Sequence, residues 1–278
     1  MRFLFLLILL FVSNTYAQKF QTVFEKSNGT KTSTYHEVIT FYSELSQKYK
    51  EISLLEMGET DSGYPLHLVV FDIDGKINLE DLKKTNKSTI LINNGIHPGE
   101  PDGIDASMML LRDIVQKDQL KEKYKNLIIC VIPVYNIGGS LNRNSHSRVN
   151  QNGPKSYGFR GNARNFDLNR DFVKSDTKNA KAFAEIFHWI DPDIFVDNHV
   201  SNGADYQYTL THLFTQHNKL GGELGAFLNQ EMMTEIEKDL QNKGLIITPY
   251  VNVFNRVPDG GFSQFFDFPR FSTGYTTL

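Results

Sequence analysis

Two places in this sequence carry side chains that bind metal ions. The first is the run His97-Pro98-Gly99-Glu100, and the second is His199, far later in the chain. A catalytic zinc ion needs three protein ligands and one open position for water or substrate, and two imidazoles with one carboxylate form a common ligand set. These residue types therefore indicate one Zn²⁺ ion and the chemistry of a hydrolase.

Short apolar segments precede both of these places. Residues 89–94 and 193–198 each contain a run of three apolar residues, which is typical of buried strands. Pro98 and Gly99 indicate a tight loop, so His97 and Glu100 should follow the end of one strand, and His199 the end of another. Ligands usually bind at the carboxyl edge of an open α/β sheet. We expect the metal ion at that edge.

Strand-like and helix-like segments alternate along most of the chain. Apolar spacing predicts further strands over residues 66–71 and 126–134, and helices over residues 35–48, 103–115, 177–189 and 222–243. Thr34 is the expected cap of the first helix. This alternation predicts an α/β fold in one large domain, with a mixed, largely parallel sheet and helices on both faces.

Composition excludes several classes of protein. The 278 residues have ordinary apolar and charged content, which is typical of a globular enzyme. A net charge of -3 gives no long-range attraction to nucleic acid or to anionic lipid. The single cysteine, Cys130, lies in an apolar segment, and we expect it to be an inert core residue.

The N-terminal residues predict export. Met1 and Arg2 precede ten apolar residues, 3–12, and a small residue, Ala17, offers a cleavage site, as in a secretory signal peptide. A membrane anchor is the alternative, but a span needs about 20 apolar residues. We therefore expect residues 1–17 to be a signal peptide, residues 18–33 a short lead segment, and the protein to be periplasmic or secreted with no stable membrane association after cleavage.

The segment 135–170 is too long for a simple connection, because loops above about 12 to 15 residues are usually functional or disordered. It carries one acid, Asp167, and many basic residues, namely Arg143, Arg148, Lys155, Arg160, Arg164 and Arg170. One interpretation is a solvated basic surface. The other is a pocket for an anion, because a guanidinium group binds a carboxylate with two hydrogen bonds.

The ordered set of motifs resembles the zinc metallocarboxypeptidase family of the carboxypeptidase A type. His97 to Glu100, then Asn169-Arg170, then His199 occur in the order of that family, and residues 153–172 look like a bacterial branch of it. The resemblance runs from about Thr34 to Leu278. It implies the αβα sandwich of these enzymes, with residues 34–278 as the catalytic domain.

The resemblance also implies a role for individual residues. His97, Glu100 and His199 match the zinc ligands, and Asp167 matches the acid that orients the first zinc histidine, although it could instead form a turn or a helix cap. Arg148 matches the arginine that stabilises the oxyanion, with Arg143 as the rival. Asn169 and Arg170 match the pair that binds the carboxylate of a peptide C-terminus. The implied partner is such a peptide, and we expect a monomer.

The last residues complicate this interpretation. Tyr275 is the candidate for the mobile tyrosine that closes over the substrate, with an ordinary packed aromatic as the alternative. The family's general base is a glutamate beyond that tyrosine, and no carboxylate follows Asp267. We therefore expect a C-terminally incomplete catalytic domain that lacks its final strand or strands and is inactive by itself. A helical solvated face explains the other acids near this end, Glu223, Glu231, Glu235 and Glu237.

Three functions follow from these residues. The first is an exported zinc carboxypeptidase that hydrolyses C-terminal peptide bonds. The second is a zinc-dependent acylase or amidase that cleaves N-acyl amino acids with a similar His-x-x-Glu site. The third is a catalytically inactive relative that keeps the zinc ion and binds peptides.

Overall fold

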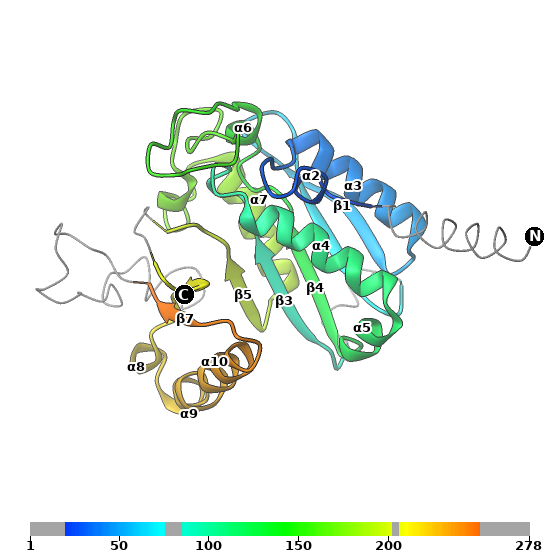
Figure 1. Cartoon of the computed structure of the whole chain (residues 1–278), viewed down its shortest axis with the longest axis vertical. Coiled ribbons are helices and arrows are strands. Elements are labelled where there is room, and N and C mark those ends of the chain that lie inside the picture. The colour runs from blue at the N-terminus through cyan, green and yellow to red at the C-terminus, as the bar shows by residue number, and fades with distance from the viewer. Residues whose placement is uncertain (1–19, 76–84, 202–205, 251–278) are drawn as a thin grey trace, which may run out of the picture. The chain divides into compact units, whose positions relative to one another are not determined.

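The computed structural model describes residues 20–75, 85–201 and 206–250. The chain divides into two units, Met1–His199 and Val200–Leu278, and Figure 1 shows the elements of each. No helix among the described residues is long and apolar enough to cross a membrane. The expected signal peptide, residues 1–17, and Tyr275 lie outside the described residues.

A five-stranded sheet lies at the centre of the first unit, in the order β1-β2-β4-β3-β5. β3 pairs in parallel with β4 and β5, whereas β2 is antiparallel to β1 and β4. The expected mixed sheet is thus confirmed. The strands are β1 (Ile52–Glu59), β2 (Pro65–Phe71), β3 (Ser88–Asn93), β4 (Leu127–Ile132) and β5 (Ile194–Asp197).

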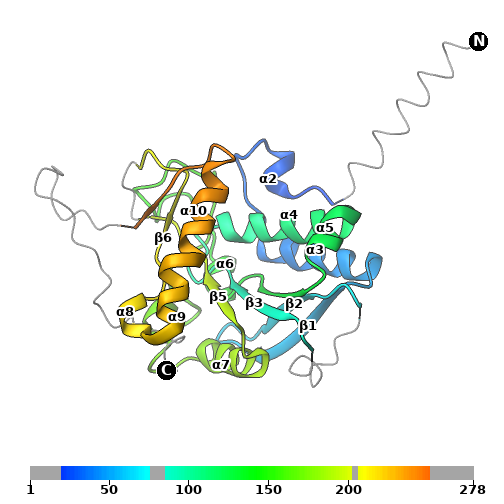
Figure 2. The same ribbon diagram turned by 90° about the horizontal axis from the view of Figure 1, so that it is seen from below.

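Helices cover both faces of this sheet, as expected. α3 (Tyr35–Lys48), α4 (Asp102–Gln116) and α5 (Asp118–Lys123) lie on one face, and α7 (Lys178–Ile190) lies on the other (Figure 2). A short helix, α2 (Val23–Lys26), precedes α3. Fully buried side chains such as Leu45, Leu111 and Val131 form the core between α3, α4 and the sheet.

The caps of the long helices explain why they begin where they do. The Thr34 side chain accepts a hydrogen bond from the backbone N–H of Glu37, and the Glu37 carboxylate accepts one from the backbone N–H of Thr34 at 2.7 Å. This capping box satisfies two backbone donors that the helix itself leaves unpaired. The Thr177 side chain caps α7 by accepting from the backbone N–H of Ala180, and Asp171 accepts a hydrogen bond from the Thr177 hydroxyl at 2.6 Å.

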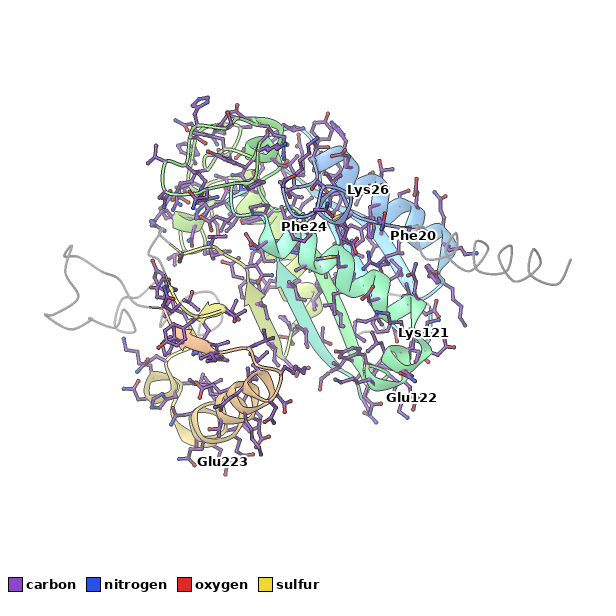
Figure 3. All side chains as sticks on the ribbon, in the orientation of Figure 1. Phe20, Phe24, Lys26, Lys121, Glu122 and Glu223 are labelled. Atoms are coloured by element: carbon purple, nitrogen blue, oxygen red, sulfur yellow. The ribbon has the colours of Figure 1, made fainter. Side chains whose placement is uncertain are left out.

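The second unit contains a parallel pair of short strands, β6 (Leu210–His212) and β7 (Ile247–Pro249), and the helices α8 (His217–Leu220), α9 (Gly222–Phe227) and α10 (Met233–Gln241). A π-helical turn, η3 (Leu228–Met232), joins α9 to α10. The expected helix over residues 222–243 is therefore one helical region with a local widening. Its four glutamates are exposed, as predicted, and Figure 3 labels Glu223 among them.

Candidate metal centre

The first two candidate ligands lie in a tight turn directly after β3. The chain leaves the strand at Asn93 and reverses at Gly95, whose φ of +66° favours glycine. The backbone N–H of Glu100 then donates to the carbonyl of His97 at 2.8 Å, which closes the turn just before α4 begins. Both side chains are buried, with exposed fractions of 2% for His97 and 5% for Glu100.

The structure brings all three candidate ligands together. Each of His97, Glu100 and His199 offers one ligand atom, and these atoms lie within 4.8 Å of one another. Nδ1 of His97 lies 3.1 Å from Oε1 of Glu100, and Nδ1 of His199 lies 2.9 Å from Oε2 of the same carboxylate. Two imidazole nitrogens and a carboxylate converging on one point fit a zinc ion with an open fourth position. The His199 side chain itself is partly exposed.

A second carboxylate lies behind each histidine. Nε2 of His97 donates to Oδ1 of Asp167 at 3.0 Å, and Nε2 of His199 donates to Oδ2 of Asp197 at 3.0 Å. Asp167 also caps the short helix η2 (Leu168–Arg170) by accepting from the backbone N–H of Asn169 at 3.0 Å. Asp167 thus makes both of the contacts that the sequence left open, one to His97 and one to the start of η2.

Neighbouring charged groups keep the carboxylates of Glu100 and Asp167 ionised. Burial raises the pKa of Glu100, but hydrogen bonds from His199 and His97 lower this pKa more, to well below its ordinary range. The pKa of Asp167 is also lowered, because contacts with His97 and Arg160 outweigh the effect of burial. Burial lowers the pKa of His199, yet Asp197 and Glu100 raise it to about 10.

The two rival arginines have different surroundings. Nη1 of Arg148 donates to Oε1 of Glu100 at 2.9 Å, so its guanidinium group lies at the candidate metal centre. Arg143 instead donates to backbone carbonyl groups, those of Thr32, Ser33 and Ser156. The position of Arg143 fits a structural role, and the position of Arg148 fits the candidate site.

Arg160 is a neighbour of the site that the sequence did not single out from the other basic residues. Its Nη2 donates to Oδ2 of Asp167 at 2.8 Å, and its Nη1 lies 3.4 Å from Nδ1 of His97. Buried Asn136 holds the backbone here by donating to the carbonyls of Ile96 and Arg160. Asp197 was missed as well, although residues i and i+2 of an extended chain point the same way and Asp197 precedes His199 by two.

Asn169 and Arg170 lie in η2, directly after Asp167. The Arg170 side chain is exposed, and its Nη1 donates to the carbonyl of Asn169 at 2.7 Å. The link through Asp167 to His97 therefore connects this pair to the candidate metal centre. The expected contribution of Tyr275 falls outside the described residues.

Comparisons with known proteins identify the family. The family model described as "Zinc carboxypeptidase" matches residues 38–199, more than half of the chain. The chain is similar to "Probable carboxypeptidase 2" of Trichophyton verrucosum (strain HKI 0517), with 26% identity over 61% of this chain and 32% of that protein. It is also similar to "Carboxypeptidase 2" of Trichophyton rubrum, with 25% identity over 61% of this chain and 30% of that protein. The chain thus spans about a third of the length of these relatives.

Solved structures share the fold. A metallo-carboxypeptidase from Burkholderia cenocepacia aligns with a TM-score of 0.55 and 15% identity, over 81% of this chain and 54% of that one. A metallo-carboxypeptidase from Pseudomonas aeruginosa, in complex with (2-guanidinoethylmercapto)succinic acid, aligns with a TM-score of 0.56 and 13% identity, over 79% of this chain and 51% of that one.

Proposed function

This chain belongs to the zinc carboxypeptidase family, and on that premise we propose that it is a zinc-dependent metallocarboxypeptidase, a hydrolase that releases C-terminal residues from peptides. One observation carries the proposal: the ligand atoms of His97, Glu100 and His199 lie within 4.8 Å of one another at the end of the sheet. That donor set suits a zinc ion with one open position.

His97, Glu100 and His199 would hold one Zn²⁺ ion. When bound, such an ion polarises the carbonyl of the scissile bond and lowers the pKa of water, which supplies a nucleophile near neutral pH. Asp167 keeps the imidazole of His97 in one orientation through its hydrogen bond to Nε2. In the proposal, the chain therefore supplies both the ligand atoms and their alignment.

The arginines near the cluster suit the negative charge that develops on the carbonyl oxygen during peptide hydrolysis. We assign oxyanion stabilisation to Arg148, which already lies at hydrogen-bond distance from Glu100. Fixed positive charge at such a position stabilises a transition state by several kcal/mol. Arg160 shares this environment and adds a second cation beside His97.

Asn169 and Arg170 are the proposed partners of the substrate's C-terminal carboxylate, and Tyr275 is the proposed residue that closes over it. The exposed guanidinium group of Arg170 is available to a ligand that arrives from solvent. A carboxylate binds such a group with paired hydrogen bonds, which would make the enzyme an exopeptidase. In this proposal, residues 34–278 belong to the catalytic domain, and residues 1–17 direct the monomer to the periplasm or the exterior.

Zinc analysis tests the ligand assignment. The full chain, without its proposed signal peptide, should bind one equivalent of zinc, and His97→Ala and His199→Ala should each abolish stoichiometric binding. His146→Ala, at an exposed histidine of the segment 135–170, is the matched control and should retain the metal. Zinc retained at full stoichiometry in both ligand variants would refute the assignment.

Substrate comparison tests the reaction. The natural protein should hydrolyse an N-blocked dipeptide and should fail on the same dipeptide with an amidated C-terminus. Faster turnover of N-acyl amino acids would instead support the acylase alternative. Peptide binding without turnover of any of these substrates would identify an inactive relative.

A further inference from the structure

Asp197 occupies a defined place between the strand that leads to His97 and the strand that leads to His199. It is the last residue of β5 and pairs with Asn93, the last residue of β3, in the parallel register. Its two carboxylate oxygens have different partners. Oδ2 accepts from Nε2 of His199 at 3.0 Å, and Oδ1 accepts from Nδ2 of Asn93 at 2.9 Å.

We propose that Asp197 is the positioning residue of His199, and that Asn93 acts through it. This inference rests on the proposed zinc centre and adds to it a residue outside the ligand set. A neutral imidazole carries one N–H and one lone pair. Because Nε2–H donates to Asp197, Nδ1 is the nitrogen left to face Glu100, and in the neutral ring Nδ1 carries the lone pair that a metal ion would bind. Asp197 thus selects the tautomer and the ring orientation that a metal ion requires.

The arrangement around the other histidine supports this interpretation. His97 also directs Nδ1 toward Glu100 and is held from behind, at Nε2, by an aspartate. The two imidazoles therefore approach the same carboxylate in the same manner, although one lies in a tight turn and the other follows a strand. In both cases an aspartate accepts from Nε2 of the histidine, although different segments of the chain supply it. This similarity indicates that both aspartates align Nδ1 with one metal ion.

The surroundings of Asp197 explain how its carboxylate keeps its position. Asn93 is fully buried, and its Nδ2 donates to the Asp197 carboxylate away from solvent. One residue further on, the backbone N–H of Asn198 donates to the carbonyl of Asn93 at 3.0 Å, and the Asn198 side chain donates to Oδ1 of Asn94 at 2.8 Å. These contacts join the two strand ends on either side of the carboxylate. A rotation of the Asp197 side chain would break the bond to Asn93 as well as the bond to His199.

Zinc affinity, measured by competition with a chromophoric chelator, tests the proposal. Asp197→Ala should raise the zinc dissociation constant by about 10- to 100-fold, the usual effect of losing such a partner. Asp197→Asn keeps an oxygen acceptor without the charge and should restore part of the lost affinity. Asp118→Ala removes the same charge from an exposed site and should leave the dissociation constant unchanged. The absorption spectrum of the cobalt-substituted protein should shift for Asp197→Ala and not for Asp118→Ala.

A double-mutant cycle tests whether Asn93 acts through Asp197. Asn93→Ala should weaken zinc binding in the natural background and should have no further effect in the Asp197→Ala background. Multiplicative effects on the dissociation constant would overturn the coupling, and unchanged affinity and cobalt spectrum in Asp197→Ala would overturn the role of Asp197. A natural protein that binds no zinc would instead refute the proposed function, so the two failures are distinguishable.

Discussion

Replacement of Asp105 by asparagine should change how the stability of the protein depends on pH. Asp105 lies on the inner side of α4 with 4% of its surface exposed, and its carboxylate accepts from the Thr32 hydroxyl at 2.5 Å. Burial raises the pKa of this carboxyl, hydrogen bonds from Thr32 and Ser33 partly lower it, and the charge of Asp102 raises it, to about 6. Arg143 and the phenol of Tyr42 also face this group.

The sign follows from proton binding in the two states. The folded protein holds the proton of Asp105 more tightly than the unfolded chain does, so this group contributes stability at low pH and loses it as the pH rises through about 6. The difference between the ordinary pKa of 3.8 and a pKa of about 6 corresponds to about 3 kcal/mol of unfolding free energy. The amide that replaces the carboxyl group in Asp105→Asn does not titrate, so the stability of this variant lacks this dependence on pH.

Urea unfolding of the metal-free natural chain and of Asp105→Asn between pH 4 and pH 7 measures the effect. Other titrating groups are common to both proteins, so the difference in unfolding free energy isolates Asp105. The unfolding free energy of the variant should rise relative to that of the natural chain by about 2 kcal/mol from pH 4 to pH 7, because the rest of the change lies below pH 4. Asp118→Asn, at an exposed site, should show no such trend. A difference that stays constant over this range would refute the argument.

Three further substitutions have expected outcomes. Gly103→Ala should weaken zinc binding and lower the unfolding free energy, because the added Cβ would lie 2.5 Å from Oδ1 of Asn94. Chelator competition measures the zinc affinity, and urea unfolding measures the unfolding free energy. Arg143→Ala should lower the unfolding free energy while leaving the zinc dissociation constant unchanged, since its guanidinium group binds backbone carbonyls, and a changed zinc affinity would contradict this. Thr34→Ala should cost about 1 kcal/mol in urea unfolding through loss of the α3 cap, and an unchanged midpoint would argue against the capping box.

Apolar periodicity predicted most of the fold. The helix expected over residues 35–48 is α3, with Thr34 as its cap, because amphipathic spacing and capping are local properties. β1 was missed. It is an edge strand on which most residues are partly exposed, so Ile52–Glu59 lacks the alternation of buried and exposed residues that identifies a strand.

The part of the candidate site that follows the ends of strands could be predicted from the sequence. His97, Glu100 and His199 follow parallel strands, and the register of those strands brings them together. The choice between Arg148 and Arg143 depends on tertiary contacts of a long loop without periodicity, so residue type and spacing could not make it. The roles of Asn169, Arg170 and Tyr275 in substrate binding stay predictions.

The pairing of Glu100 with His199 spans 99 residues of sequence, so the candidate metal centre cannot assemble from a local segment. Closing so long a loop costs conformational entropy before any contact compensates for it, and contacts of this kind form slowly in folding. The ligand set is complete only after β5 has joined β3. Zinc would then bind the finished sheet alone and stabilise it by mass action. An ion held across that junction would slow the detachment of β5 and so lengthen the lifetime of the folded chain.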